Sequence, residues 1–210
     1  MRKMLTTAAM LLASVAVPAT PAVAAPPPPN KMVLDIVGVN GSGCPQSTVG
    51  VQVSPDNTAI TITYSNYLAQ VGVGASPLDF RKNCQIAMNV HVPQGFTYAI
   101  AKADYRGFVH LESGASGYEA ANYYFQGESQ NARVQHNFFG PRDGDWTTTD
   151  VAGVASLSFL PCGEMRNLNV NTELRVNAGT SDTRTKTSML TMDSTDTSLT
   201  TIYHLAWKKC

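Results

Sequence analysis

Strict alternation of apolar and polar residues is the feature of this sequence that most constrains its fold. Over residues 168–176, apolar or threonine side chains occupy every even position, and polar or charged side chains occupy every odd position. The segments 60–65, 86–92 and 202–207 alternate in the same way. A period of two residues is typical of a β-strand that packs one face on a core and shows the other to solvent. From Met32 onward there is no coiled-coil heptad and no long helical pattern, so the sequence predicts a nearly all-β chain.

Residues that favour tight turns separate the alternating segments. Residues 54–57 (Ser-Pro-Asp-Asn) lie between two of them and predict a β-hairpin. Residues 93–95 end another segment, and glycine-rich or polar stretches at 114–117, 140–144 and 193–198 predict loops. Short connections favour antiparallel pairing. We therefore expect an antiparallel, jelly-roll-like β-sandwich of about nine or ten strands, with a closed β-barrel as the alternative.

The first 24 residues have the pattern of an export signal. Arg2 and Lys3 form a positive region, residues 5–17 form an apolar segment of 13 residues, and Ala22-Val23-Ala24 matches a cleavage site. The apolar segment is too short for a bilayer of about 30 Å, although an uncleaved membrane anchor is the alternative. We expect a secreted, extracellular protein without membrane contact after cleavage.

Three parts follow from this pattern: a signal peptide (1–24), a proline-rich leader (25–30) and a single domain (31–210). Because proline lacks an amide donor, we expect the leader to be short, stiff and solvated rather than part of a sheet. Removing Arg2 and Lys3 lowers the basic count from 15 to 13 against 15 acidic residues, which leaves a net charge of about −2. A nucleic-acid-binding face is basic, so the composition argues against a nucleic-acid partner.

Four widely spaced cysteines, Cys44, Cys84, Cys162 and Cys210, indicate two disulfides in an exported chain. Three pairings are open, and we favour the sequential one, Cys44–Cys84 and Cys162–Cys210. Each disulfide would then close a loop of about 40 to 50 residues and would stabilise the folded state by roughly 4 kcal/mol in the chain-entropy model. A zinc site is the rival interpretation, but no close pair of ligands supports it.

Several short strings occur together in an order that resembles a known family. They are 41–45 (GSGCP), 54–59 (SPDNTA), 81–84 (RKNC), 104–107 (DYRG), 123–125 (YYF), 161–163 (PCG) and 207–210 (WKKC). In this order they resemble the small secreted proteins of bacteria and fungi known as domain of unknown function 4360. The resemblance covers nearly the whole mature chain. It implies export and a shared cysteine framework; it supplies no activity, so no catalytic residue is carried over.

Polar groups offer four candidate sites, each with a structural alternative. The glycine loop at 41–43 invites a phosphate-binding interpretation, but freedom of the backbone beside a disulfide explains it better. Asp104 and Arg106 share a strand face, where a surface contact is the alternative to gripping a polar ligand. The acidic stretch 142–145 with Asp150 suggests a loose calcium site, with a solvated turn as the default. Three outward histidines, His91, His110 and His204, with Glu112 beside His110, suggest metal binding or acid–base chemistry; independent surface residues are the alternative.

Aromatic residues concentrate between positions 118 and 146. They are Tyr118, Tyr123, Tyr124, Phe125, Phe138, Phe139 and Trp146. Alternation sends Tyr123 and Phe125 to one face and Tyr124 to the other, and we predict that Tyr118 and Tyr124 point outward while Tyr123 and Phe125 pack in the core. Exposed rings on an exported β-sandwich could stack on sugars; packing in the core is the competing interpretation for the group as a whole.

These observations favour a non-catalytic extracellular binding module for polysaccharide or cell-wall glycan, with Tyr118 and Tyr124 as ligand-binding residues. The alternatives are an extracellular hydrolase, for which the sequence offers no convergent acid–base pair, and a protein-binding inhibitor or effector. We expect no catalytic residue, no metal ligand and no cofactor.

Overall fold

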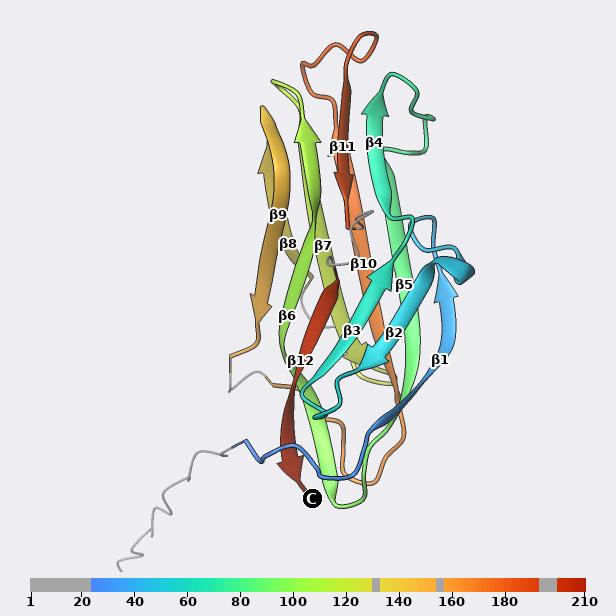
Figure 1. Ribbon diagram of the computed structural model, residues 1–210, viewed down its shortest axis with the longest axis vertical. Coiled ribbons are helices and arrows are strands. Elements are labelled where there is room, and N and C mark those ends of the chain that lie inside the picture. The colour runs from blue at the N-terminus through green and yellow to red at the C-terminus, as the bar shows by residue number, and fades with distance from the viewer. Residues whose placement is uncertain (1–23, 130–132, 154–156, 193–199) are drawn as a thin grey trace, which may run out of the picture.

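Twelve strands in two facing antiparallel sheets make up the described part of the computed structural model, which comprises residues 24–129, 133–153, 157–192 and 200–210 (Figure 1). The strands are β1 (Val33–Asn40), β2 (Val49–Val53), β3 (Ala59–Tyr64), β4 (Leu68–Gly72), β5 (Arg81–His91), β6 (Phe96–Leu111), β7 (Ser116–Phe125), β8 (Val134–Phe139), β9 (Arg142–Val151), β10 (Asn167–Asn177), β11 (Thr187–Thr191) and β12 (Thr201–Lys209). One short 3-10 helix, η1 (Gln46–Thr48), precedes β2. No helix among these residues is long and apolar enough to cross a membrane.

The expected sandwich is confirmed, with more strands than predicted. One sheet has five strands in the order β1-β5-β10-β7-β8. The other has seven, in the order β2-β3-β12-β6-β11-β4, with β9 on the free edge of β6. The long strand β6 pairs with β12 and β11 along one edge and with β9 along the other, so it organises the larger sheet. Neither sheet closes into the alternative barrel within the described residues.

The alternating segments pack as their pattern predicts. In β10 the five even positions from Leu168 to Val176 are buried, and the odd positions are half-buried or exposed. In β5, Ile86, Met88 and Val90 are buried in the same way. In β12, Tyr203 and Trp207 belong to the core and Leu205 packs against it, whereas Ala206 lies outside the core cluster, as alternation predicts. Ala206 is nevertheless only 9% exposed, and the pairing of β12 with β6 shifts register after His204.

Both predicted disulfides are confirmed, which excludes the zinc alternative. The Cα atoms of Cys44 and Cys84 lie 5.4 Å apart, and those of Cys162 and Cys210 lie 5.7 Å apart. A Cβ atom at Gly41, whose φ is +137°, would lie 2.1 Å from the Asn83 carbonyl oxygen. The glycine therefore lets the loop approach β5 closely enough for the first disulfide to form. Residues 157–160, directly before Cys162, lie outside any strand.

The proline-rich segment is docked on the sandwich rather than solvated along its whole length. Its amide at Ala25 donates to the Trp207 carbonyl oxygen over 2.8 Å and forms a β-bridge. Pro28 is buried. The prediction failed because it considered only the missing amide donors of proline, whereas the carbonyl oxygens of the segment still accept hydrogen bonds. The predicted signal peptide lies outside the described residues, apart from Ala24.

Asn57, in the β2–β3 turn, joins this segment to the body of the protein. Its side-chain nitrogen, Nδ2, donates to the carbonyl oxygens of Pro28 and Asn30 over 3.0 and 2.9 Å. Its side-chain oxygen accepts from the Met32 amide over 2.9 Å. Its own carbonyl oxygen accepts from the Trp207 indole over 2.8 Å. Asn57 is 2% exposed and adopts a φ of +57°, a conformation that asparagine tolerates better than most residues.

Replacing Asn57 should therefore destabilise the whole sandwich. Asn57→Ala removes three buried hydrogen bonds and imposes a strained backbone, so we expect a loss of about 2 to 4 kcal/mol in the free energy of unfolding. Asn57→Gly removes the same bonds and keeps the backbone conformation accessible, so its loss should be about 1 kcal/mol smaller. Urea unfolding of the three proteins measures both differences. A loss below about 0.5 kcal/mol for both variants would show that the docked segment adds nothing to stability.

Candidate functional site

An open groove crosses the outer face of the five-stranded sheet. Its volume is about 250 Å³. The lining is mostly polar and comprises Arg81, Asn83, Cys84, Gln85, Ala120, Asn122, Arg133, Asn171, Thr172 and Glu173. Ala120 lies on this outer face and is nevertheless only 1% exposed, because longer side chains on the neighbouring strands rise above it. The small side chain makes the floor, and amides and guanidinium groups make the walls.

Strand register aligns four amide side chains in one row, and three of them, Gln85, Asn171 and Asn122, line the groove. Asn40 of β1 is opposite Gln85 of β5, Gln85 is opposite Asn171 of β10, and Asn171 is opposite Asn122 of β7. Neighbouring strands lie about 4.8 Å apart, so the row spans roughly 15 Å. Each amide offers both a donor and an acceptor. The row can therefore hydrogen-bond an extended polar ligand that lies across the strands.

Toward the start of β5, the two rows beyond the amides carry charged side chains. Glu173 of β10 accepts hydrogen bonds from Arg81 Nε over 2.9 Å and from the Tyr118 hydroxyl over 2.5 Å. Its Oε1 lies 3.1 Å from Arg133 Nη2 and 3.8 Å from Arg175 Nε. Burial opposes ionisation of Glu173, but the hydrogen bonds from Tyr118 and Arg81 and the nearby positive charges prevail and lower its pKa. One ionised carboxylate thus faces three guanidinium groups.

Tyr118 and Tyr124 both lie on the predicted outer face, on either side of the groove along β7. The structure changes the role expected of Tyr118. Arg133 and Arg175 stand over its ring at 5.4 and 5.7 Å from the centroid. A ring covered by guanidinium groups and tied to Glu173 is not an open platform for stacking on a sugar. Alternation predicted its direction but could not predict its neighbours on the adjacent strands.

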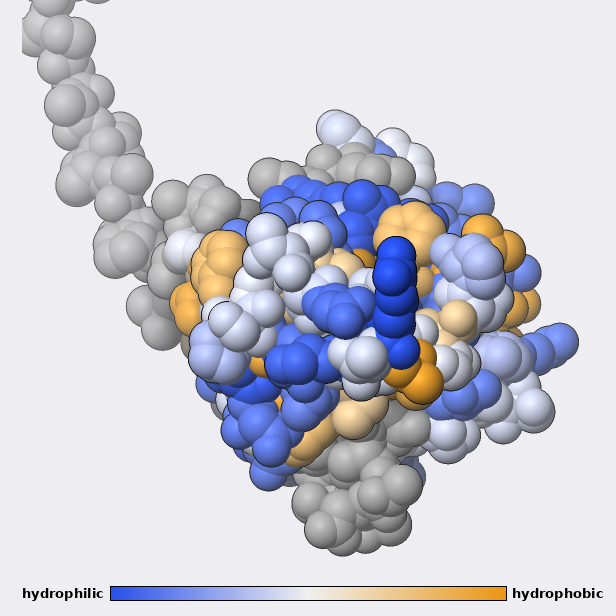
Figure 2. All heavy atoms as spheres, turned by 90° about the horizontal axis from the view of Figure 1, so that it is seen from above, coloured by the Kyte–Doolittle hydropathy of each residue, from blue (hydrophilic) through white to orange (hydrophobic). Residues whose placement is uncertain are grey.

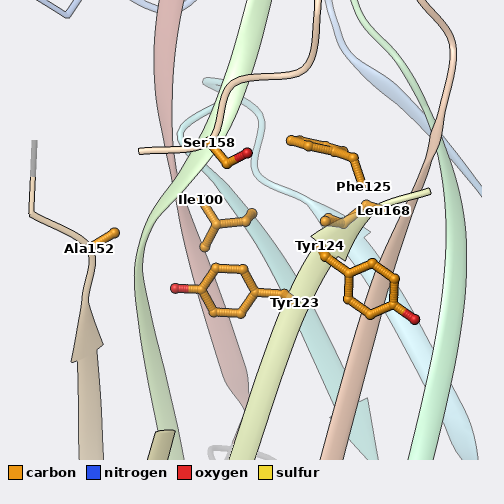
Figure 3. A pocket seen from close by; sticks show the side chains of 7 residues that line it. All are labelled: Ile100, Tyr123, Tyr124, Phe125, Ala152, Ser158 and Leu168. Atoms are coloured by element: carbon orange, nitrogen blue, oxygen red, sulfur yellow. The ribbon is translucent and has the colours of Figure 1, made fainter. Parts of the chain in front are cut away.

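Tyr124 differs from its neighbours Tyr123 and Phe125, as predicted. Tyr123 and Phe125 pack against the hydrophobic core, and the Tyr123 ring lies 5.9 Å from that of Tyr203. Figure 3 shows the Tyr124 ring leaving β7 on the side opposite to Tyr123, beside a cavity of about 40 Å³. Half-buried Tyr124 is therefore the aromatic residue with an accessible ring at this end of the groove.

Packing in the core explains most of the remaining aromatic concentration. Phe138 and Trp146 are buried and contact each other, with ring centroids 5.1 Å apart. Phe139 is the exception, with 72% of its surface exposed. Seen from above, the described part of the molecule presents mostly hydrophilic side chains with scattered hydrophobic ones (Figure 2). Of the two interpretations of this aromatic region, packing in the core therefore holds for most residues, and the region does not form an exposed aromatic row.

An acidic pair, Glu119 and Asp150, lies inside the sandwich, and no sequence pattern predicted that pairing. Glu119 points inward from β7 and is fully buried, and its Oε1 has no hydrogen-bond partner within the described part of the chain. Burial, together with the nearby charge of Asp150, raises the pKa of Glu119 to about 8. Asp150 of β9 accepts a hydrogen bond from His136 Nε2 over 2.7 Å. The pair lies on the opposite side of β7 from the groove, so it does not supply acid–base chemistry there.

Each histidine is paired with a carboxylate of its own. His91 contacts Asp35, His110 contacts Asp143, and His204 contacts Asp104, with nitrogen–oxygen distances of 2.8 to 2.9 Å. Glu112 lies 3.7 Å from His110, as their shared face predicted. No group of three or more histidine, cysteine or acidic side chains with metal-binding geometry occurs among the described residues. The histidines are thus separate contacts rather than one cluster.

The other polar candidates have structural roles. Residues 142–145 belong to strand β9 and not to the turn we predicted, because the turn forms one step earlier, at Gly140-Pro141. Asp143 and Asp150 consequently point to opposite faces of β9 and cannot share a cation. Ser42, in the glycine loop, contacts Asn83 beside the first disulfide. Asp104 binds Lys102, Thr149 and His204 rather than Arg106.

Glu119 should make stability depend on pH. The pKa of Glu119 is raised in the folded state. The stability that the folded state has with a protonated Glu119 is therefore fully present below about pH 4.5 and is lost as the pH rises through about 8. We expect Glu119→Gln to remove this dependence and to gain about 3 to 5 kcal/mol relative to the unsubstituted protein between pH 5 and pH 9, at about 1.4 kcal/mol per unit of pKa. Urea unfolding across this range measures the gain. Glu164→Gln, a surface substitution, is the control, and parallel profiles for all three proteins would contradict the buried proton.

Comparison with known proteins agrees with export. A secreted protein of Arthroderma benhamiae, described as uncharacterized, is 37% identical over 184 residues, which cover 88% of this chain and 74% of the relative. A solved structure, the enzymatically active domain of tailspike protein 4 of bacteriophage CBA120, aligns with a TM-score of 0.24 and 7% identity. That alignment covers 85% of this chain but only 19% of the tailspike chain, and it carries no argument. The protein is secreted, like its fungal relative. The family model for the domain of unknown function DUF4360 matches residues 30–210, and the chain belongs to this family.

Proposed function

We propose that this secreted protein is a non-catalytic binding module for polysaccharide or cell-wall glycan, and that the groove on the five-stranded sheet is its binding surface. The observation that carries the proposal is the row of four amides in register, from Asn40 to Asn122. Sugar hydroxyls both donate and accept hydrogen bonds, and amide side chains are the neutral groups that match them in both senses. A row that spans roughly 15 Å suits a chain of sugars better than a single small molecule.

The openness of the groove also favours a polymer. Small-molecule sites are mostly apolar and enclose the greater part of their ligand, whereas this groove is open and polar over a floor of Ala120. A polysaccharide can run across such a surface and leave at either side. Tyr124, at one end of the same face, adds an apolar ring on which a sugar can stack.

The lining favours binding over hydrolysis. Most glycoside hydrolases use two carboxylates on either side of the scissile bond. Glu173 is the one carboxylate among the lining residues that the structure describes, and its pKa is lowered by its partners. A general acid needs a raised pKa. Glu119, whose pKa is raised, is on the inner face of β7.

Removing amides from the row tests the proposal. The protein purified from culture medium is passed over chitin, cellulose, peptidoglycan and host wall fractions. We expect retention on at least one of them, and Asn171→Ala and Gln85→Ala should each weaken it about threefold to tenfold, the worth of one neutral hydrogen bond. Gln52→Ala is the matched control, because Gln52 is an exposed amide on the other sheet. Equal losses for all three variants, or no retention on any material, would contradict the proposal.

The two faces of β7 should respond oppositely to substitution. Phe125→Ala leaves a cavity in the core, so we expect it to cost about 3 to 5 kcal/mol of stability. Tyr124→Ala should leave the melting temperature nearly unchanged and weaken polysaccharide retention about fivefold, since a ring contact is worth on the order of 1 kcal/mol. Thermal melts and retention assays on both variants measure this. If Tyr124→Ala melts the protein as much as Phe125→Ala does, the Tyr124 ring is part of the core and is not a binding residue.

A further inference from the structure

The charge at one end of the groove is unbalanced. Arg81, Arg133 and Arg175 all meet Glu173, and no other carboxylate forms an ion pair with any of the three in the described ranges. Three positive charges against one negative charge leave a net charge of about +2 in a mature protein whose overall charge is about −2. This is a local positive site on the outer face of the five-stranded sheet.

The hydrogen-bond donors of this cluster also exceed what Glu173 can accept. A guanidinium carries five N–H donors and a carboxylate has about four acceptor sites, so fifteen donors face about four. Tyr118 uses part of that capacity as well, through its hydroxyl. The side chains of Arg81, Arg133 and Arg175 remain 41%, 45% and 42% exposed. Each of the three side chains therefore keeps part of its surface open to solvent, and Arg81 and Arg133 line the groove itself.

Glu173 and Tyr118 hold these guanidinium groups in place. Arg81 binds the carboxylate through both Nε and Nη2, and Arg133 and Arg175 also stand over the Tyr118 ring. Arg175 lies opposite Arg81 and Tyr118 in the sheet, so the backbone sets the spacing of this row. Planar guanidinium groups that are held in position bind carboxylates in a bidentate manner. The row of amides lies four residues further along the same strands, at Gln85 and Asn171, and the Asn83–Glu173 pair lies between the two rows.

We propose that the groove selects acidic polysaccharides, with Arg81, Arg133 and Arg175 binding the carboxylates of uronic acid residues while the amides bind the sugar hydroxyls. The inference rests on the proposed function, because it names the class of glycan for the same groove. It goes beyond that function because it states that the arginines bind the carboxylates of the ligand. The ligand is a sugar polymer and not an acidic protein, because the positive cluster continues directly into a neutral, amide-lined surface.

The decisive comparison uses one polymer in two charge states. Binding of the purified secreted protein is measured against polygalacturonate and against the same polymer with its carboxylates methyl-esterified. We expect affinity for the acid form to be at least about tenfold higher, as for charge-assisted hydrogen bonds. The difference should shrink in about 0.5 M salt, since the groups are partly exposed. Equal binding of the two forms would overturn the inference and leave the proposed function standing, whereas binding of neither, nor of any other glycan, would overturn both.

Three substitutions and two further polymers complete the test. Arg81→Gln and Arg133→Gln should each weaken polygalacturonate binding about threefold to tenfold and leave binding to the methyl ester unchanged. Arg184→Gln, which removes a charge from an exposed loop, should do neither. Arg175→Gln is less useful because Arg175 also packs on Phe80 and Tyr118. Dextran sulfate binding as strongly as polygalacturonate would show that any anionic sugar suffices and would overturn the assignment to carboxylates. Competition by polyaspartate at equal charge would overturn the assignment to sugars.

Discussion

The hydrogen bond from the Trp207 indole to the Asn57 carbonyl oxygen is the contact on which the rest of the sandwich depends. It joins the β2–β3 turn to the last strand, and the side chain of the same asparagine binds the segment that leads into β1. Trp207 is buried and its backbone also pairs with Ala25. The segment that leads into the five-stranded sheet is thus held to the seven-stranded sheet where a turn and the final strand meet. A buried polar group without its partner is costly, so this point tolerates little change.

Local patterns predicted what depends on single strands, and failed where several strands meet. Alternation correctly placed the even positions of β10 and the opposite directions of Tyr123 and Tyr124. It also separated Tyr203 and Trp207, which lie in the core, from Ala206, which lies outside the core cluster. Spacing and export correctly favoured the sequential disulfides. The docking of residues 25–30 was not predicted because it depends on the Asn57 side chain. The sequence of a turn does not indicate that its asparagine amide is buried.

The groove could not be predicted because it is a property of register. The polar odd positions of 168–176 were visible in the sequence as solvent-facing residues. That Gln85, Asn171 and Asn122 share one row, and that three arginines surround Glu173, follows only from how β5, β10 and β7 align. A shift of one residue in any pairing would send these side chains to the opposite face. The signal that could have suggested the site is the choice of asparagine, glutamine and arginine on two solvent faces, in place of the lysine and glutamate usual on surfaces.

The position of β12 has a consequence for how the protein reaches its folded state. This strand, residues 201–209, lies between β3 and β6 in the middle of the larger sheet. While a chain emerges from an export channel with its amino end first, β3 and β6 are available long before their common neighbour, and each offers an unpaired edge to other chains. The sandwich must therefore assemble after translocation, with contacts that are distant in sequence and slow to form. Cys210 follows β12 directly, so oxidation with Cys162 becomes feasible only when this strand has been inserted, and it then makes the insertion permanent.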